Sequence, residues 1–86
     1  MIIGFADKGW EDYQYWIVND KKIFKRINLL LKDIKRNPLD CRGIGKPEQL
    51  KENFSGYYSR RITAEHRLVY KILDDIIIVA QCRYHY

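Results

Sequence analysis

Apolar positions in the first part of the chain occur first as a short run and then at the spacing of a helix. Residues Ile2–Phe5 form the apolar run, which predicts a short strand. Downstream, Trp10, Tyr13 and Ile17 share one face of a helix predicted over 8–18. The chain therefore begins with a strand followed at once by an amphipathic helix.

The next segment carries the strongest helical pattern in the sequence. Asp20 is a suitable N-cap, basic residues occupy the last turn, and Asn37-Pro38 ends the pattern. The apolar set is Ile23, Ile27, Leu30, Leu31 and Ile34, and the basic set is Lys21, Lys22, Lys25, Arg26, Lys32, Lys35 and Arg36. Because the apolar set repeats at the helical period, we predict a helix with one buried and one solvated face.

The second half of the chain predicts a sheet. After a loop region over 39–53, strand patterns run over 57–63, 67–73 and 76–84, with tight turns between them. The predicted fold class is α+β, with two N-terminal helices packed on an antiparallel three-stranded meander that the first strand can join. The helices cover one face of this sheet and leave the other face open.

Side-chain alternation indicates what the open face carries. In the middle strand, Arg67, Val69 and Lys71 share one side. In the last strand, one parity becomes polar toward the C-terminus, which predicts that His85 lies near Arg67 on the face away from the helices. This parity comprises Ile77, Val79, Gln81, Arg83 and His85.

Two neighbouring arginines in the first meander strand must point to opposite faces. One of Arg60 and Arg61 therefore lies on or near the helix side. We expect that guanidinium to reach solvent at the rim of the sheet.

Candidate chemistry gathers on the open face. Guanidinium groups bind phosphate in bidentate fashion, and histidine exchanges a proton near neutral pH. Metal-independent RNA cleavage needs a base for the 2′-hydroxyl, an acid for the 5′-oxygen and a cation for the phosphorane. The candidates are Glu48 in the preceding loop, with Arg61, Arg67, Arg83 and His85 on the sheet. Spacing alone favours a basic nucleic-acid-binding domain over a nuclease.

Composition bounds what the chain can be. Its 86 residues suit a single domain over 1–86. With 16 basic and 11 acidic residues, the formal charge is +5, which favours an anionic partner: nucleic acid first, a membrane surface second. The longest purely apolar run, Ile76–Ala80, is too short to span a membrane.

Cysteine and histidine usage predicts no metal centre. Cys41, Cys82, His66 and His85 do not have the spacing of a zinc site. One disulfide is arithmetically possible, but a reduced cytoplasmic chain is favoured, because Cys82 falls in an apolar strand pattern. The N-terminus has no basic region and no long apolar region, so no signal peptide is expected.

Several motifs in combination resemble one known family. They are Trp10-Glu11-Asp12-Tyr13, Gly45-Lys46-Pro47-Glu48, Ser59-Arg60-Arg61-Ile62-Thr63, His66-Arg67-Leu68-Val69-Tyr70 and Arg83-Tyr84-His85-Tyr86. Each is weak alone, but together they resemble the YoeB toxins of the RelE/ParE superfamily of toxin–antitoxin modules. The match runs from the first predicted helix to the last residue.

The resemblance implies an activity and a set of roles. Members of the family have a RelE-like, microbial-ribonuclease-type fold and act as ribosome-dependent mRNA interferases that cut mRNA in the A site. By motif, Glu48 matches the general base, Arg67 the arginine that stabilises the transition state, and His85 the general acid. The implied products carry a 2′,3′-cyclic phosphate, and neither a metal nor a cofactor is expected.

The resemblance also implies RNA contacts and partners. The terminal Tyr86 matches a residue that helps to orient the RNA, and Lys51 and Arg61 match positions near the RNA backbone. The implied partners are a YefM-like antitoxin, the ribosome with its mRNA, and a second copy of the chain in a homodimer. The expected location is cytoplasmic, as the cysteine usage favours.

The sequence departs from the family pattern in two places. The loop over 40–45 is about two residues longer than usual, a length change that a surface loop tolerates. Tyr58 stands where a tryptophan is common. The Gly-Lys-Pro-Glu pattern survives the longer loop, so Glu48 keeps its assignment.

Two rival function classes are open to the same fold. A ParE-like gyrase poison would need none of the ribonuclease residues, and the Arg83-Tyr84-His85-Tyr86 ending argues against it. A non-catalytic RNA- or ribosome-binding module would need the basic surface without the base and the acid.

Overall fold

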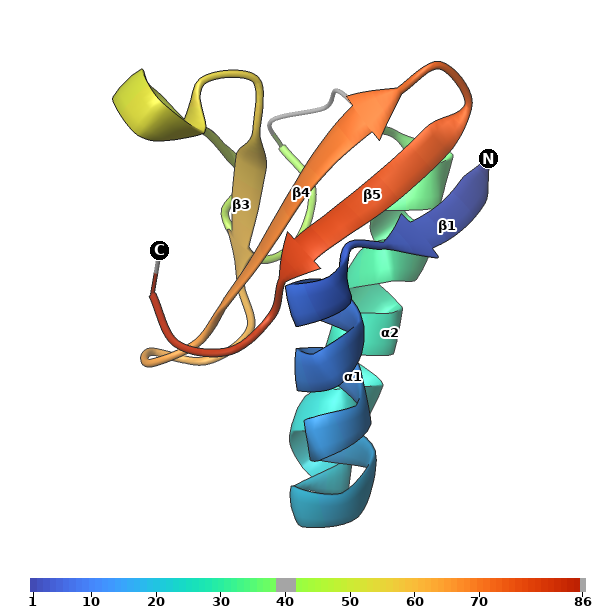
Figure 1. Ribbon diagram of the computed structural model, residues 1–86, viewed down its shortest axis with the longest axis vertical. Helices are drawn as coiled ribbons and strands as arrows, with labels where there is room; N and C mark the ends of the chain where they lie inside the picture. The colour runs from blue at the N-terminus through green and yellow to red at the C-terminus, as the bar shows by residue number, and fades with distance from the viewer. Residues whose placement is uncertain (39–41, 86) are drawn as a thin grey trace.

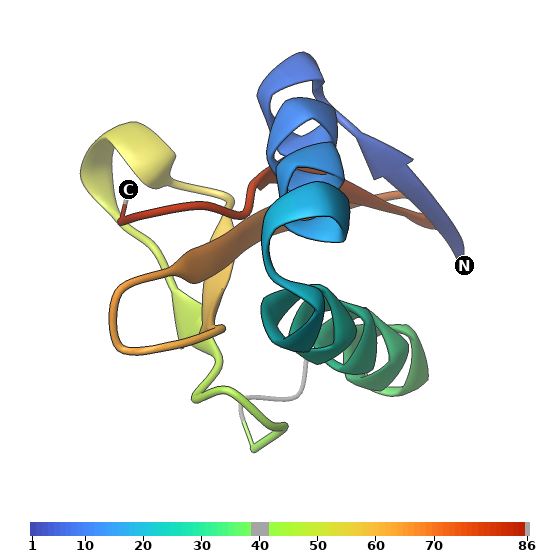
Figure 2. The same ribbon diagram turned by 90° about the horizontal axis from the view of Figure 1, so that it is seen from below.

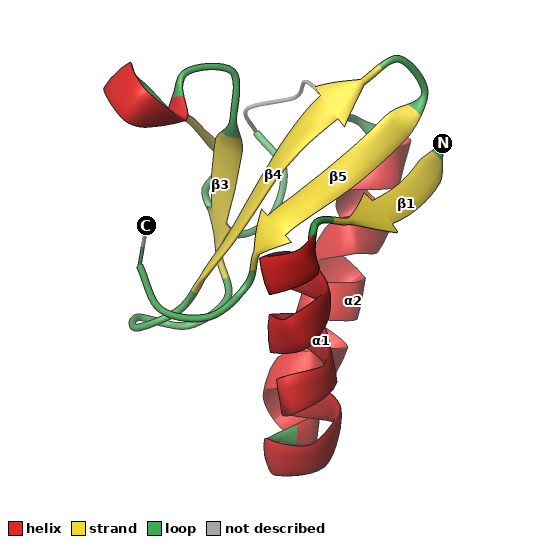
Figure 3. Cartoon of the chain, viewed as in Figure 1, coloured by secondary structure: helices red, strands yellow, loops and turns green. Residues whose placement is uncertain are grey.

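The computed structural model describes residues 1–38 and 42–85 and shows an α+β fold with a five-stranded mixed sheet (Figures 1 and 3). The strand order is β1-β5-β4-β3-β2. The elements are β1 Ile2–Phe5, α1 Asp7–Asn19, α2 Lys21–Arg36, β2 Glu48–Gln49, the 3₁₀ helix η1 Glu52–Phe54, β3 Tyr58–Arg61, β4 Arg67–Leu73 and β5 Ile76–Gln81. This architecture confirms the predicted α+β class.

The first strand joins the sheet at its edge. β1 runs parallel to β5, with Ile3 opposite Ile77, whereas the other neighbouring strands pair antiparallel. Several element boundaries differ from the prediction. β3 is shorter than the predicted 57–63, and α1 is one residue longer at each end than the predicted 8–18. Glu48–Gln49 forms the short strand β2 in a region predicted as loop, because it pairs with β3. β5 ends at Gln81, whereas the sequence pattern extended it to Tyr84.

The two helices lie side by side and antiparallel (Figures 1 and 2). α2 begins at the predicted N-cap, where the Asp20 carboxylate accepts hydrogen bonds from the N–H groups of Lys22 and Ile23. α1 packs closely on β5 at Gly9, because a Cβ there would lie 2.2 Å from the Val79 carbonyl oxygen. In the described part of the chain, neither helix has the length and apolar character needed to cross a membrane.

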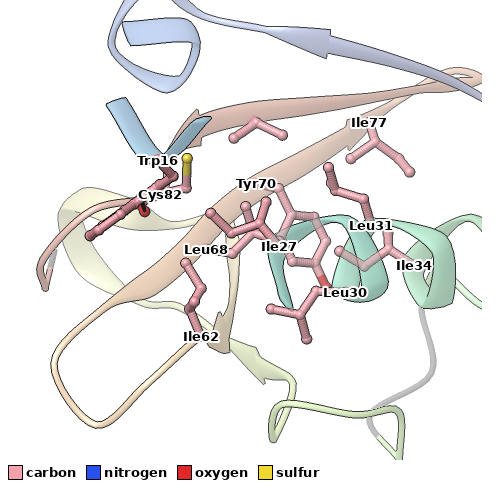
Figure 4. Packing of buried hydrophobic residues seen from close by; sticks show 11 residues of the cluster. Trp16, Ile27, Leu30, Leu31, Ile34, Ile62, Leu68, Tyr70, Ile77 and Cys82 are labelled. Carbon is pink, nitrogen blue, oxygen red and sulfur yellow. Dashed lines mark hydrogen bonds between the residues drawn. The ribbon is translucent and has the colours of Figure 1, made fainter. Parts of the chain in front are cut away.

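The apolar face of α2 packs on the sheet to form the core (Figure 4). The core residues are Trp16, Ile27, Leu30, Leu31, Ile34, Ile62, Leu68, Tyr70, Ile77, Val79 and Cys82. Ile77 and Val79 are fully buried in this cluster, so the predicted parity of the last strand, which had them on the open face, is wrong. Because residues 76–80 are all apolar, alternation carries no local sign of the buried side, and packing against the helices decides it.

The rim position predicted for one arginine is also wrong, because Arg60 is fully buried. Its Nη1 donates to the Asp33 carboxylate on α2 and to the Ile44 carbonyl, and its Nε donates to the Tyr70 hydroxyl. A buried charge needs such partners, and here α2 supplies the anionic one. The hydrogen bond from Arg60 lowers the pKa of the Asp33 carboxyl, and burial raises the pKa of the Tyr70 hydroxyl.

Candidate active site

A polar pocket of about 370 Å³ brings together residues that lie far apart in the sequence. Its walls come from the loop before β2, from β2 and β3, from the start of β4 and from the segment after β5. The lining residues are Lys46, Pro47, Glu48, Ser59, Arg61, Arg67 and His85. Three cationic side chains and one carboxylate face this space, so its electrostatic character suits an anionic group such as phosphate.

Glu48 reaches the pocket through a loop that is held by its backbone. Gly45 and Lys46 have positive φ values of 80° and 51°, and the Gly45 carbonyl accepts a hydrogen bond from the Arg61 N–H. Glu48 then pairs with Ser59 in the β2–β3 ladder. Because the ladder fixes the backbone while the Glu48 side chain stays exposed, the carboxylate faces the pocket without a partner among the described residues.

Arg67 is held in place by hydrogen bonds from one nitrogen of its guanidinium. Nη1 donates to three carbonyl oxygens of the preceding turn, those of Thr63, Ala64 and His66, at 2.7, 3.2 and 3.1 Å. Within residues 1–38 and 42–85, no acceptor is bound to Nε or Nη2. The guanidinium is therefore fixed in orientation and keeps donors for a phosphate in the pocket.

The segment after β5 leads to the C-terminus (Figure 1), and its residue His85 lines the pocket. The Cys82 N–H leaves the strand ladder and donates to Asp12 Oδ2 at 3.1 Å, and Trp16 Nε1 donates to the Cys82 carbonyl at 2.9 Å. Tyr84 then adopts a φ of 63°, in the left-handed region, which turns the chain. His85 thus lines the same pocket as Arg67, and the turn places it there, not strand parity.

Two further sequence candidates, Arg83 and Lys51, are not among the lining residues of the pocket. Arg83 packs over the Tyr15 ring of α1, with its guanidinium carbon 3.6 Å from the ring centroid, and its Nη2 donates to the Tyr84 hydroxyl. Lys51 is exposed and precedes η1. Tyr86 lies outside the described residues. RNA contact by these three side chains stays a prediction.

Two pocket residues were not singled out from the sequence. Lys46 adds a cation beside Glu48, and the signal for it is the Gly-Lys-Pro-Glu motif itself. Ser59 shares the parity of Arg61 on β3, so alternation would have placed it on the same face.

The buried thiol near the site has no chemical role in it. Burial raises the pKa of Cys82 to about 12. The group is therefore a protonated thiol in the core at neutral pH, and it packs as a small apolar side chain. This agrees with its position in an apolar strand pattern.

Comparison with known proteins places the chain in one family. Residues 5–86 match the family described as YoeB-like toxin of bacterial type II toxin-antitoxin system. Toxin YoeB of Escherichia coli K12 is 55% identical over 86 residues and covers all of both chains, and Toxin YoeB of Synechocystis sp. is 57% identical, covering 100% of this chain and 98% of the relative.

Solved structures agree with this placement. The YoeB/ParE toxin from Agrobacterium tumefaciens superposes with a TM-score of 0.94 at 43% identity and covers all of both chains. YoeB in a heterotetrameric YoeB-YefM complex from Staphylococcus aureus gives a TM-score of 0.91 at 56% identity, covering 100% of this chain and 98% of that one. The predicted resemblance is thereby confirmed, and the chain belongs to the YoeB-like toxins of bacterial type II toxin–antitoxin systems.

Proposed function

We propose that this toxin is a ribosome-dependent endoribonuclease that cleaves mRNA in the ribosomal A site and so inhibits translation. The observation that carries the proposal is the convergence of Glu48, Arg67 and His85 in one pocket from three separate segments. A carboxylate, a guanidinium with free donors and an imidazole are the groups that metal-independent RNA cleavage uses.

The proposed reaction is a transesterification within the RNA. Glu48 takes the proton of a 2′-hydroxyl, whose oxygen attacks the adjacent phosphorus. Arg67 stabilises the extra negative charge of the phosphorane, and His85 gives a proton to the departing 5′-oxygen. The products are a 2′,3′-cyclic phosphate on one fragment and a 5′-hydroxyl on the other.

The other predicted site residues bind RNA in this proposal. Arg61 lines the pocket beside Arg67, where a second guanidinium can hold an adjoining phosphate. Lys51, which is exposed before η1, binds the RNA backbone in this proposal. Arg83 and Tyr86 bind the RNA from the C-terminal segment.

Dependence on the ribosome follows from the exposure of the site. Glu48 and His85 are exposed. Among the described residues, none bonds to either side chain so as to fix the position of one relative to the other. An ordered substrate would supply the alignment that the free protein lacks, because orientation of reacting groups accounts for a large share of catalysis. We therefore expect free RNA to be cut poorly. Work at the ribosome also requires a cytoplasmic location.

The relatives suggest the protein partners. YoeB from Staphylococcus aureus is solved both in a heterotetrameric complex with YefM and as a YoeB dimer. Since those chains are 56% identical to this one over its whole length, we propose a YefM-like antitoxin and a homodimer here too. Size-exclusion chromatography with light scattering, with and without a co-expressed antitoxin, tests both assemblies.

Single-turnover cleavage on programmed ribosomes tests the activity. Wild type should cut a short message in the A site and leave a 2′,3′-cyclic phosphate. Glu48→Gln keeps the shape of the side chain but removes the base, so it should bind ribosomes normally and cut roughly 10²- to 10⁴-fold more slowly. Glu11→Gln, an exposed carboxylate on α1, is the matched control.

Other outcomes would replace the proposal. Inhibition of gyrase without cleavage would assign the chain to the ParE-like function. Ribosome binding without cleavage would make it a binding module. If Glu48→Gln keeps the wild-type rate, the base lies elsewhere in the pocket.

A further inference from the structure

His66 is a nearly buried histidine in the turn before β4, 7% exposed, to which the cleavage chemistry gives no part. Its Nδ1 accepts a hydrogen bond of 2.8 Å from the backbone N–H of Tyr84. The two residues are 18 positions apart, so the bond ties the β3–β4 turn to the C-terminal segment. The residue after Tyr84 is His85, the proposed general acid.

The contact fixes the protonation state of the imidazole. Because the Tyr84 N–H donates, Nδ1 must be the unprotonated acceptor and Nε2 must carry the proton. A Glu65 carboxylate oxygen lies 3.7 Å from Nε2, and this negative charge suits an N–H group at Nε2. The Trp16 ring packs edge-on against the imidazole at 4.7 Å, and the Tyr84 ring lies 5.3 Å from it.

The same bond acts on Tyr84, a strained residue of the C-terminal segment. Tyr84 has a φ of 63°, a conformation that persists only where the surroundings enforce it. Its N–H is held by His66, and its carbonyl accepts a hydrogen bond of 3.1 Å from the Arg67 N–H. Both sides of the Tyr84 turn are therefore anchored to the residues that begin β4.

His66 also contacts the other half of the site. Its carbonyl oxygen accepts one of the three hydrogen bonds from Arg67 Nη1, at 3.1 Å. One residue thus touches the segment that carries the proposed acid and the guanidinium proposed to stabilise the phosphorane. Its side chain governs the first contact, whereas its backbone makes the second.

We propose that His66 is a positioning residue for RNA cleavage: its neutral imidazole, through Nδ1, holds the Tyr84 turn so that His85 faces the phosphate bound at Arg67. The assignment rests on the proposed endoribonuclease function. His66 does not touch the reacting atoms, and it acts only through the backbone of Tyr84.

Three substitutions separate the acceptor from the ring. His66→Asn places an amide oxygen close to the position of Nδ1, so it can still accept from the Tyr84 N–H. His66→Phe keeps a ring against Trp16 and Tyr84 but has no acceptor. His66→Gln carries its amide one bond farther out, near the position of Nε2, and serves as a second variant that lacks the correct acceptor.

Single-turnover cleavage on ribosomes should rank these variants. We expect His66→Phe and His66→Gln to cut on the order of 10- to 100-fold more slowly than wild type, because a misplaced catalytic group loses rates of this size. His66→Asn should recover most of the rate. Ribosome affinity should be the same for all three, since the change lies in alignment and not in the charge that binds RNA. Equal rates for His66→Asn and His66→Phe would overturn the proposal.

Hydrogen exchange of the Tyr84 amide, measured on the free protein by NMR, tests the contact without RNA. The amide should exchange slowly in wild type and His66→Asn, and at least about tenfold faster in His66→Phe. Unchanged exchange in His66→Phe would refute the contact in solution. If wild type fails to cut mRNA while the exchange pattern holds, the endoribonuclease function fails and the His66 anchor of the C-terminal segment stands.

Discussion

Arg60 and Arg61 are neighbours in β3, yet they belong to two different regions of the molecule. Arg60 points into the core, fully buried, where Asp33, Ile44 and Tyr70 accept its hydrogen bonds. Arg61 points the other way, is exposed, and lines the pocket. In the part of the chain that the structure describes, no side-chain hydrogen bond or ion pair engages its guanidinium.

The difference shows how one residue type serves structure on one face and chemistry on the other. Removing a guanidinium from water is costly unless an anion and further acceptors replace the water. Three acceptors engage Nε and Nη1 of Arg60, whereas its buried Nη2 has no hydrogen-bond partner among the described residues. In the pocket, water hydrates the cations, and they remain available to a phosphate. The ion pair and hydrogen bonds of Arg60 hold the fold together, whereas the guanidinium donors left open on Arg61 and Arg67 mark the site.

The largest expected effect separates activity from stability in the pocket. We predict that His85→Ala lowers single-turnover cleavage roughly 10²- to 10⁴-fold, because it removes the general acid. The free energy of unfolding should not change, since only the backbone carbonyl of His85 is bonded within the described residues, to Gln81. Cleavage and urea unfolding measured on the same preparation check both halves. Near-normal cleavage would remove His85 from the mechanism.

The next effect is expected in the buried region, where a substitution should lower stability. Arg60→Met should reduce the free energy of unfolding by about 3 kcal/mol, because Asp33 loses its partner and Tyr70 an interaction. Arg61→Met is the matched control and should change it by no more than about 0.5 kcal/mol, as is typical of exposed positions. Urea denaturation followed by tryptophan fluorescence measures both.

A double variant identifies the cause of that loss. Asp33→Leu combined with Arg60→Met removes both charges, so much of the lost stability should return. If the double variant is as unstable as the sum of its parts, the loss comes from packing and not from an unpaired carboxylate. If Arg61→Met matches Arg60→Met, the contrast between the two faces of β3 is wrong.

The helices could be predicted because their sequences contrast sharply. α2 has a continuous apolar face, a cationic face and Asp20 at its start, so its period and its boundaries are readable locally. β5 offers no such contrast, because Ile76–Ala80 are all apolar and either side can be buried. Its parity is set by packing on the two helices, a long-range contact that no local pattern reports.

The site shows the same division. Glu48, Arg67 and His85 could be named from their motifs, and the structure brings them together. The burial of Arg60 could not be predicted from the sequence, since its partner Asp33 is 27 positions away. The sequence names His66 in a family motif but predicts no role for it, because that role depends on a contact with a segment 18 residues downstream.

A smaller effect tests one acceptor of the buried arginine. Tyr70→Phe removes the hydroxyl that accepts from Arg60 Nε at 3.2 Å but leaves the ring in the core. We expect the free energy of unfolding to fall by about 1–2 kcal/mol, the cost of leaving a buried donor without its acceptor. Tyr58→Phe, whose ring stacks on that of Tyr70, controls for the loss of a hydroxyl at a half-buried site. Equal losses in the two variants would show that this bond adds nothing specific.

The smallest effect is a dependence of stability on pH that only the buried region should show. The hydrogen bond from Arg60 lowers the pKa of Asp33 in the folded protein below its unfolded value of about 3.9. The unfolded state therefore binds the proton first as the pH falls. The stabilisation is fully present above the unfolded pKa and is lost as the pH falls through the folded pKa. Because the Asp33 side chain is 21% exposed, solvent weakens the pair and the effect is modest.

Urea unfolding of wild type and Asp33→Asn between about pH 2.5 and pH 7, at constant ionic strength, measures this effect. The difference in unfolding free energy between the two proteins should be constant above about pH 5 and should shrink at lower pH, because Asp33→Asn has no proton to gain there. Arg60→Met removes the cause of the lowered pKa, so Asp33→Asn made in that background should show no such change with pH. A difference that stays constant down to the lowest pH would mean that Arg60 does not hold the carboxylate in its ionised form. The buried cluster would then stabilise the fold through its neutral hydrogen bonds alone, and the contrast with the pocket would rest on burial and not on charge.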